Sequence, residues 1–135
     1  MKTAKKLGIW MDYAIAHIME IKGKSILTTE IESEFTWEEK QHSFFRNEGF
    51  MHKKEREYVS NYFEKIEDHI AGADEVVLFG PGDAKTELFN RLTADPKFKH
   101  IELSVKTTDN LTENQRQAFV KRHFQRKPNW SEIEE

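Results

Sequence analysis

Four acidic residues are the side chains best suited to enzymatic chemistry. Asp12 and Asp83 each follow a short apolar run, and Glu57 and Glu64 lie in a segment with helical spacing. Acidic side chains hold the paired metal ions of nucleases, so Asp12, Asp83 and one of the two glutamates are candidate ligands. However, both glutamates flank a helix face that core residues occupy, and Asp83 stands at an N-cap position where carboxylates are common. We therefore predict no catalytic residue, and keep a divalent-metal nuclease as the alternative.

The segment that contains Asp83 could also bind an anion. Gly80, Pro81 and Gly82 join an apolar run to the start of a helix, and Lys85 adds a positive charge there. Free backbone amides at a helix N-terminus attract anions. The segment lacks the spacing of a P-loop or of a dinucleotide site, so a rigid strand-to-helix turn is the alternative interpretation.

The remaining residue types exclude several other sites. The six histidines show no H-x-x-x-H or H-E-x-x-H spacing, and the chain has no cysteine. We therefore predict no metal site, no cofactor, no disulfide and no cysteine nucleophile. No serine lies in a G-x-S-x-G motif, so the sequence also offers no serine nucleophile.

A basic segment near the C-terminus is the clearest charge asymmetry. No acidic residue lies between Gln115 and Pro128, and that stretch contains five basic ones: Arg116, Lys121, Arg122, Arg126 and Lys127. We predict that they form a face that binds RNA or an acidic partner. Cations also complement the dipole at a helix C-terminus, so a solvated helix end is the alternative.

A long polar stretch, residues 34–51, contains the other candidate binding residues. Its aromatic side chains could stack on bases or cover a partner: Phe35, Trp37, Phe44, Phe45 and Phe50. They could equally fold back onto the protein as a lid. Loops of this length inside a compact domain are usually functional or disordered.

Composition limits the class of protein. The chain has 135 residues, 37% of them hydrophobic, and its formal net charge is −3, from 21 basic and 24 acidic residues. This length predicts one domain, and the residues after the last helix predict a C-terminal tail over 127–135. The net charge argues against a nucleic-acid coat protein. The absence of cysteine and of long apolar runs predicts a cytoplasmic protein that does not enter a membrane.

Hydrophobic spacing predicts the elements that position these residues. Apolar alternation predicts strands over residues 6–13, 14–22 and 25–33, with a tight turn at Gly23. A helix should cover residues 52–72, followed by a strand over 75–79 and a helix from Asp83 to Thr93. The remaining pattern predicts a strand over residues 100–106 and a helix that opens at a capping box of Thr112 and Gln115.

This order of elements, β-β-β-α-β-α-β-α, predicts the fold class. Three meander strands followed by two crossover units give an α/β protein with a mixed five-stranded sheet and helices on both faces. It is the order of a ribonuclease H-like fold.

Two segments of the sequence also resemble a known protein family. The segments VVLFGPGDAKTELFNRL and IWMDYAIAHIMEI are similar to the middle domain of class I eukaryotic and archaeal release factors and of Pelota. The chain is similar above all to stand-alone bacterial relatives of this domain, described as translational machinery proteins, and the resemblance implies a domain core over about residues 7–124. In peptide-releasing members a Gly-Gly-Gln tip lies between the third strand and the first long helix, and residues 34–51 contain no such tripeptide.

The resemblance implies a Pelota-like role without peptide release. We predict a non-catalytic, translation-associated binding protein that contacts the ribosome, RNA or a ribosome-associated protein. An oligomeric scaffold, in which the loop aromatics self-associate as a homo-oligomer, is a further alternative.

Overall fold

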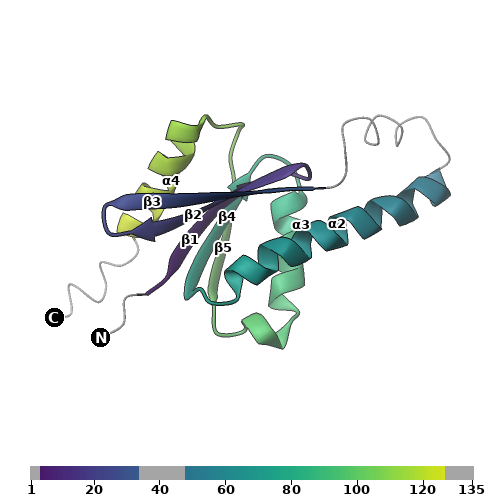
Figure 1. Ribbon diagram of the computed structural model, residues 1–135, viewed down its shortest axis with the longest axis horizontal. Coiled ribbons are helices and arrows are strands. Elements are labelled where there is room, and N and C mark those ends of the chain that lie inside the picture. The colour runs from purple at the N-terminus through teal and green to yellow at the C-terminus, as the bar shows by residue number, and fades with distance from the viewer. Residues whose placement is uncertain (1–3, 34–47, 127–135) are drawn as a thin grey trace.

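The computed structural model describes the backbone of residues 4–33 and 48–126, and the side chains of residues 4–33 and 56–125 (Figure 1). Five strands form one mixed sheet in the order β3-β2-β1-β4-β5. Strands β1 (Lys6–Met11), β2 (Ile15–Lys22) and β3 (Ser25–Glu32) form an antiparallel meander. Strand β4 (Glu75–Gly80) runs parallel to β1, and β5 (Glu102–Thr107) runs parallel to β4.

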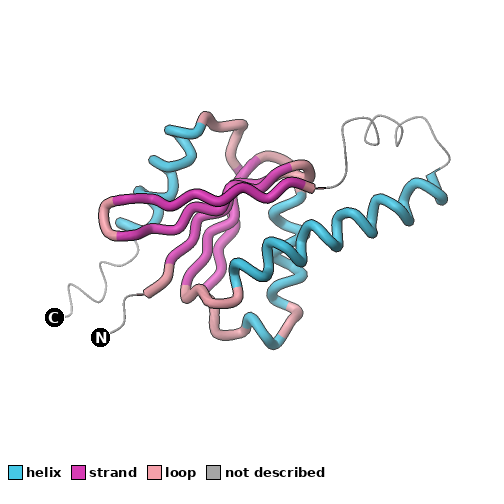
Figure 2. Tube along the Cα trace, in the orientation of Figure 1, coloured by secondary structure: helices cyan, strands magenta, loops and turns pink. Residues whose placement is uncertain are grey.

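Three α-helices and one short 3₁₀ helix connect and cover these strands. Helix α2 (Glu48–Ile70) leads from the meander to β4, and α3 (Ala84–Thr93) follows β4. The 3₁₀ helix η1 (Pro96–Phe98) precedes β5, and α4 (Glu113–Arg126) ends the described chain. Figure 2 shows α2 and α3 on one side of the sheet and α4 on the other.

Alternation along β2 places apolar side chains on both faces of the sheet. Ala16 and Ile18 belong to the core under α2 and α3, whereas Met19 belongs to the core under α4. Successive side chains of a strand point to opposite faces, so a strand covered on both sides needs apolar residues at consecutive positions. Strand β2 is therefore covered on both sides of the sheet.

The helices bury the faces that their spacing predicts. In α2, Tyr62, Phe63, Ile66 and Ile70 recur at three- and four-residue intervals and are all buried. This spacing places side chains on one stripe of a helix. Helix α3 buries Leu88 and Leu92 in the same core.

The predicted α/β fold, with its order of elements, its mixed five-stranded sheet and its helices on both faces, is confirmed. Helix α2 spans Glu48–Ile70, so it begins four residues before the predicted range of 52–72 and ends two residues before the end of that range. Its first turn therefore lies within the stretch that the sequence indicated as a loop. This turn has two adjacent apolar residues, Phe50 and Met51, and a glycine, so it gives no hydrophobic period from which its helical state could be predicted. None of the described helices is long and apolar enough to span a bilayer.

Candidate functional site

Asp12 lies where β1 ends, and its carboxylate shapes the turn into β2. Its Oδ1 accepts hydrogen bonds from the backbone N–H groups of Ala14, at 2.8 Å, and Ile15, at 2.9 Å. The Tyr62 hydroxyl of α2 donates to the Asp12 carbonyl oxygen at 2.8 Å. Burial raises the pKa of Tyr62, so this phenol remains a donor. These bonds give Asp12 a structural task at the turn, of the kind that Asp side chains commonly perform.

The four candidate carboxylates do not converge. Among the described residues, no three His, Asp or Glu side chains lie close enough together to hold a metal ion. Glu57 is exposed, and Glu64 lies 3.9 Å from Arg91 in an ion pair. Asp83 takes the predicted N-cap position of α3, but its side chain makes no capping hydrogen bond. Two-metal catalysis needs ligands gathered around both ions, and the described residues provide no such group.

The turn after β4 is shaped by two glycines with positive φ. Gly80 has φ 139° and Gly82 has φ 72°. A Cβ atom on Gly80 would stand 2.5 Å from the carbonyl oxygen of Met11, so this position has no room for a side chain. Gly82 has open space around it, and its requirement is the left-handed backbone conformation alone.

Lys85, in the first turn of α3, holds this turn by a hydrogen bond from its side chain. Its side chain is almost fully buried, and its ammonium group donates a hydrogen bond to the carbonyl oxygen of Gly82. Pro81 is half-buried, whereas Gly82 is exposed. A buried ammonium group needs a partner, and the Gly82 carbonyl supplies one. The anion-binding role of Gly80, Pro81, Gly82 and Lys85 stays a prediction.

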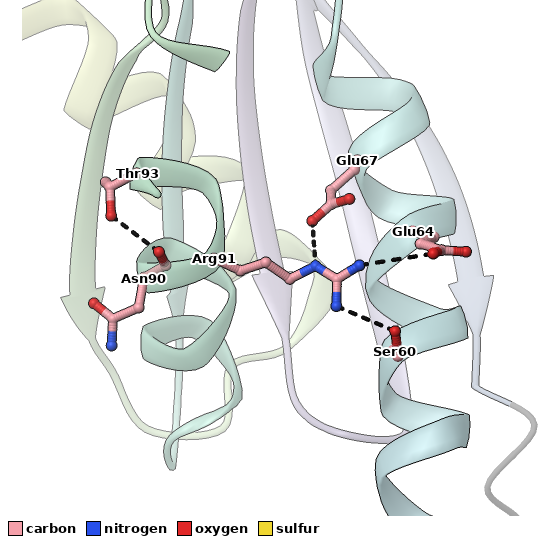
Figure 3. A network of polar contacts seen from close by, with 6 residues as sticks. All are labelled: Ser60, Glu64, Glu67, Asn90, Arg91 and Thr93. Atoms are coloured by element: carbon pink, nitrogen blue, oxygen red, sulfur yellow. Dashed lines mark hydrogen bonds and ion pairs between the residues drawn. The ribbon is translucent and has the colours of Figure 1, made fainter. Parts of the chain in front are cut away.

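Polar contacts join α3 to α2 at Arg91 (Figure 3). The Arg91 guanidinium lies 2.6 Å from the Glu67 carboxylate through its Nε, and its Nη1 lies 3.3 Å from the Ser60 hydroxyl. The same group stands over the Phe63 ring, 5.8 Å from its centroid. A guanidinium can combine ion pairing, hydrogen bonding and ring contact, so Arg91 fixes one helix against the other.

The basic residues of α4 divide into two groups. The Arg116 guanidinium lies 5.4 Å from the centroid of the buried Trp10 ring and donates to the Leu111 carbonyl at 2.7 Å. Arg116 therefore packs against the sheet, whereas Lys121 and Arg122 are exposed. Arg116 therefore does not lie on the same exposed surface as Lys121 and Arg122. The side chain of Arg126 and the whole of Lys127 lie outside the described residues.

A buried histidine lies beside Trp10 under the first turns of α4. His17 of β2 is 9% exposed, and its Nδ1 lies 3.4 Å from the Glu30 carboxylate of β3. Its ring centroid is 5.7 Å from that of Trp10. Burial, followed by the positive charge of Arg116, lowers the pKa of His17 below its ordinary value, although Glu30 acts in the opposite direction.

Two further lysines, which the basic face predicted from the sequence does not include, lie at the end of the sheet where α4 ends. The Lys6 ammonium group stands 5.9 Å from the centroid of the Phe124 ring. Lys24 is exposed in the turn between β2 and β3. Lys24 belongs to the predicted hairpin turn, so the pairing of β1 with β2 could have indicated that Lys6 lies near it.

Most of the predicted loop aromatics lie outside the described residues, namely Phe35, Trp37, Phe44 and Phe45. Phe50 lies in the first turn of α2, and its side chain is not among those described. Both the stacking and the lid interpretation of these rings stay predictions.

No protein-family model matches the sequence, and no curated protein is significantly similar to it. Solved structures do share its fold. Pelota from Archaeoglobus fulgidus aligns at 12% identity and a TM-score of 0.56, over 90% of this chain and 32% of its own. Pelota from Thermoplasma acidophilum aligns at 13% identity and a TM-score of 0.57, over 87% of this chain and 32% of its own.

An archaeal translation termination factor aligns at 18% identity over 79% of this chain and 31% of its own, with a TM-score of only 0.47. The chain thus spans about a third of the length of the Pelota structures that it matches. Identities this low show the architecture and leave activity to be argued from the residues of the chain itself. The similarity establishes that this chain has the fold of one part of Pelota.

Proposed function

We propose that the chain is a non-catalytic, translation-associated binding domain that contacts the ribosome in the cytoplasm. The observation that carries the proposal is the outer side of α4, where Lys121 and Arg122 are exposed on a helix with no acidic residue after Glu113. Ribosomes present dense phosphate charge, and exposed lysine and arginine side chains bind such surfaces. The Pelota-like fold supports the same assignment, because the Pelota structures cover nearly the whole chain.

The described acidic residues favour binding over catalysis. The Asp12 carboxylate is committed to backbone amides, and Glu64 is paired with Arg91. No observation among the described residues favours the divalent-metal nuclease. The sequence between β3 and α2 also lacks the Gly-Gly-Gln tripeptide on which peptide release by the resembled factors depends.

Co-sedimentation with purified ribosomes tests the proposal. Wild-type protein should pellet with ribosomes at low salt, and the fraction in the pellet should fall as salt increases. The double variant Lys121→Glu/Arg122→Glu should pellet several-fold less. A matched control, Lys65→Glu/Lys99→Glu, makes the same charge change at exposed positions on the side of α2 and η1 and should behave like wild type.

Two results would overturn the proposal. One is wild-type protein that stays in the supernatant at low salt. The other is equal loss of pelleting in the test and control variants, since this would indicate attraction without a defined surface.

A further inference from the structure

We infer that the exposed basic side of α4 continues across the end of the sheet to Lys6 and Lys24, and that this surface binds the phosphate backbone of double-stranded RNA. The four-residue set Lys6, Lys24, Lys121 and Arg122 is called the basic end below. The inference rests on the proposed function for the choice of RNA over DNA, and it adds the binding surface and the chemistry of its partner.

The strand register brings the members of the basic end together. Leu7 pairs with Glu20, so Lys6 stands beside Ile21 at the same end of the sheet. Ile21 and Ile26 flank the hairpin turn that contains Lys24, and both pack against the core that includes Phe124 of α4. Residues along a strand are about 3.3 Å apart and neighbouring strands about 4.8 Å apart. Lys24 therefore lies roughly 10 Å along the hairpin from the position beside Lys6.

The contact of Lys6 with Phe124 connects the sheet to the helix. The Lys6 ammonium lies 5.9 Å from the ring centroid, and Phe124 is only 4% exposed. A lysine can cover an apolar ring with its aliphatic stem while its charge remains in water. The charge of Lys6 is thus held beside the last turns of α4, where Lys121 and Arg122 are exposed. Figure 1 shows this end of α4 beside the β2–β3 hairpin.

Strand β1 has no acidic residue, and helix α4 has none after Glu113. Glu75 of β4, however, is the register partner of Lys6 and alternates onto the same face of the sheet as Val77 and Phe79, so Lys6 is a member of the basic end with an acidic neighbour. Glu20 of β2 pairs with Lys22 at 3.7 Å, and both alternate onto the face away from α4. The Debye length is about 8 Å at physiological ionic strength, so cations of the basic end that stand within this distance of one another reinforce each other's attraction for phosphate.

The chemistry of these side chains suits phosphates and not bases. Three of the four are lysines, whose ammonium groups are point charges without the fork geometry that reads base edges. Of the aromatic rings on this side, Trp10, Phe79 and Phe124 are buried, and Phe119 is half-buried and stacked on Phe79. Single-stranded RNA is usually held by exposed rings on which bases stack, and no Phe, Trp or Tyr ring among the described side chains is exposed. Phosphate contacts alone favour a duplex, which is bound by shape and charge.

Fluorescence anisotropy with an RNA duplex of about 16 base pairs tests this inference, because that length spans a typical duplex-binding domain. Wild-type protein should bind the duplex more tightly than either of its single strands. The logarithm of its affinity should fall linearly with that of salt, with a slope of about −3 to −4 for four phosphate contacts.

Two double variants divide the basic end between sheet and helix. Lys6→Glu/Lys24→Glu and Lys121→Glu/Arg122→Glu should each weaken duplex binding at least about tenfold and reduce the magnitude of the salt slope by about two. The matching glutamine variants should lose less affinity, because they remove attraction without adding repulsion. Lys65→Glu/Lys99→Glu should stay within about twofold of wild type, since surface charges away from the contact contribute little. Circular dichroism and the urea midpoint verify that each variant is folded.

Each alternative outcome contradicts a particular statement. Loss of duplex binding in the helix variant only would exclude Lys6 and Lys24 from the surface. Equal affinity for single strands would overturn the duplex assignment. Ribosome pelleting that depends on Lys121 and Arg122 without any duplex binding would overturn this inference in favour of an acidic protein partner, and the proposed function would stand. Duplex binding through the basic end without ribosome pelleting would support the surface and overturn the proposed function.

Discussion

The two faces of the sheet are built differently. The face under α2 and α3 contains the larger core, with Tyr62, Phe63, Ile66 and Leu88 all nearly inaccessible, and Arg91 joins its two helices. The face under α4 has a smaller core with a close aromatic pair, in which the Phe79 and Phe119 rings are 4.1 Å apart. Buried apolar area is the main source of stability, so the first face should provide more of the free energy of folding.

The face under α4 instead contains charged and titratable groups. It contains the buried His17, the Arg116 contact with Trp10, and the basic end. Helix α4 packs on the smaller core only, so its outer side is available for charged side chains, whereas the larger core under α2 and α3 maintains the fold. This difference indicates that substitutions on the α2 and α3 side should act through stability, whereas those on the outer side of α4 should act through binding.

The largest expected effect is on the first face. Phe63→Ala removes a ring that is 1% exposed and leaves a cavity between α2 and the sheet. Truncation of a buried phenylalanine commonly lowers the free energy of unfolding by about 3–5 kcal/mol. Phe124→Ala should cost less, because Phe124 is in the last turns of α4, where the chain can adjust. Urea denaturation of both variants measures the difference, and a larger loss for Phe124→Ala would contradict the comparison.

A smaller effect is expected where α4 touches the sheet most closely. A Cβ on Gly8 would stand 2.3 Å from Cγ2 of Val120, so Gly8→Val forces α4 away from β1. Overpacking of this kind typically costs about 1–3 kcal/mol of unfolding free energy. Val120→Ala removes the clashing methyl groups, so the double variant should be more stable than the sum of the two single losses predicts. Strict additivity in urea denaturation would show that the helix does not rest on Gly8.

The sequence was sufficient to predict the regular elements of both faces. The Gly23 turn, the alternation of β2 and the helical spacing of Tyr62, Phe63, Ile66 and Ile70 are local patterns, and the structure confirms them. The capping box is also confirmed, because the Thr112 N–H donates to the Gln115 side chain at 2.9 Å and the Gln115 N–H donates back at 3.2 Å. Such patterns depend on residues a few positions apart, which makes them readable from sequence.

The candidate site could be predicted only in part, because it depends on contacts between distant segments. The inward position of Arg116 follows from a ring on β1, more than a hundred residues earlier. The two residues added to the basic end depend likewise on strand register. Periodicity shows that a side chain lies on a helix face, but it does not show which partner from another element meets that face.

The last and smallest prediction concerns pH and the buried histidine. Burial and Arg116 hold the pKa of His17 below its ordinary value in the folded protein. The unfolded chain therefore binds a proton at this site more readily than the folded protein does. The contribution of His17 to stability is complete above its ordinary pKa of about 6.5 and is lost as the pH falls from there towards the lowered folded value. The urea midpoint of wild-type protein should accordingly decrease between about pH 7.5 and 5.5, a window above the usual carboxylate range.

His17→Asn should flatten this dependence, whatever its effect on absolute stability, because asparagine does not titrate. His100→Asn is the matched control, since His100 is exposed, and it should leave the slope unchanged. A wild-type midpoint that rises on acidification would mean that the attraction of Glu30, 3.4 Å away, outweighs burial and Arg116. In that case His17 would be stabilised in its charged form, and His17 and Glu30 would form an ion pair on the α4 face.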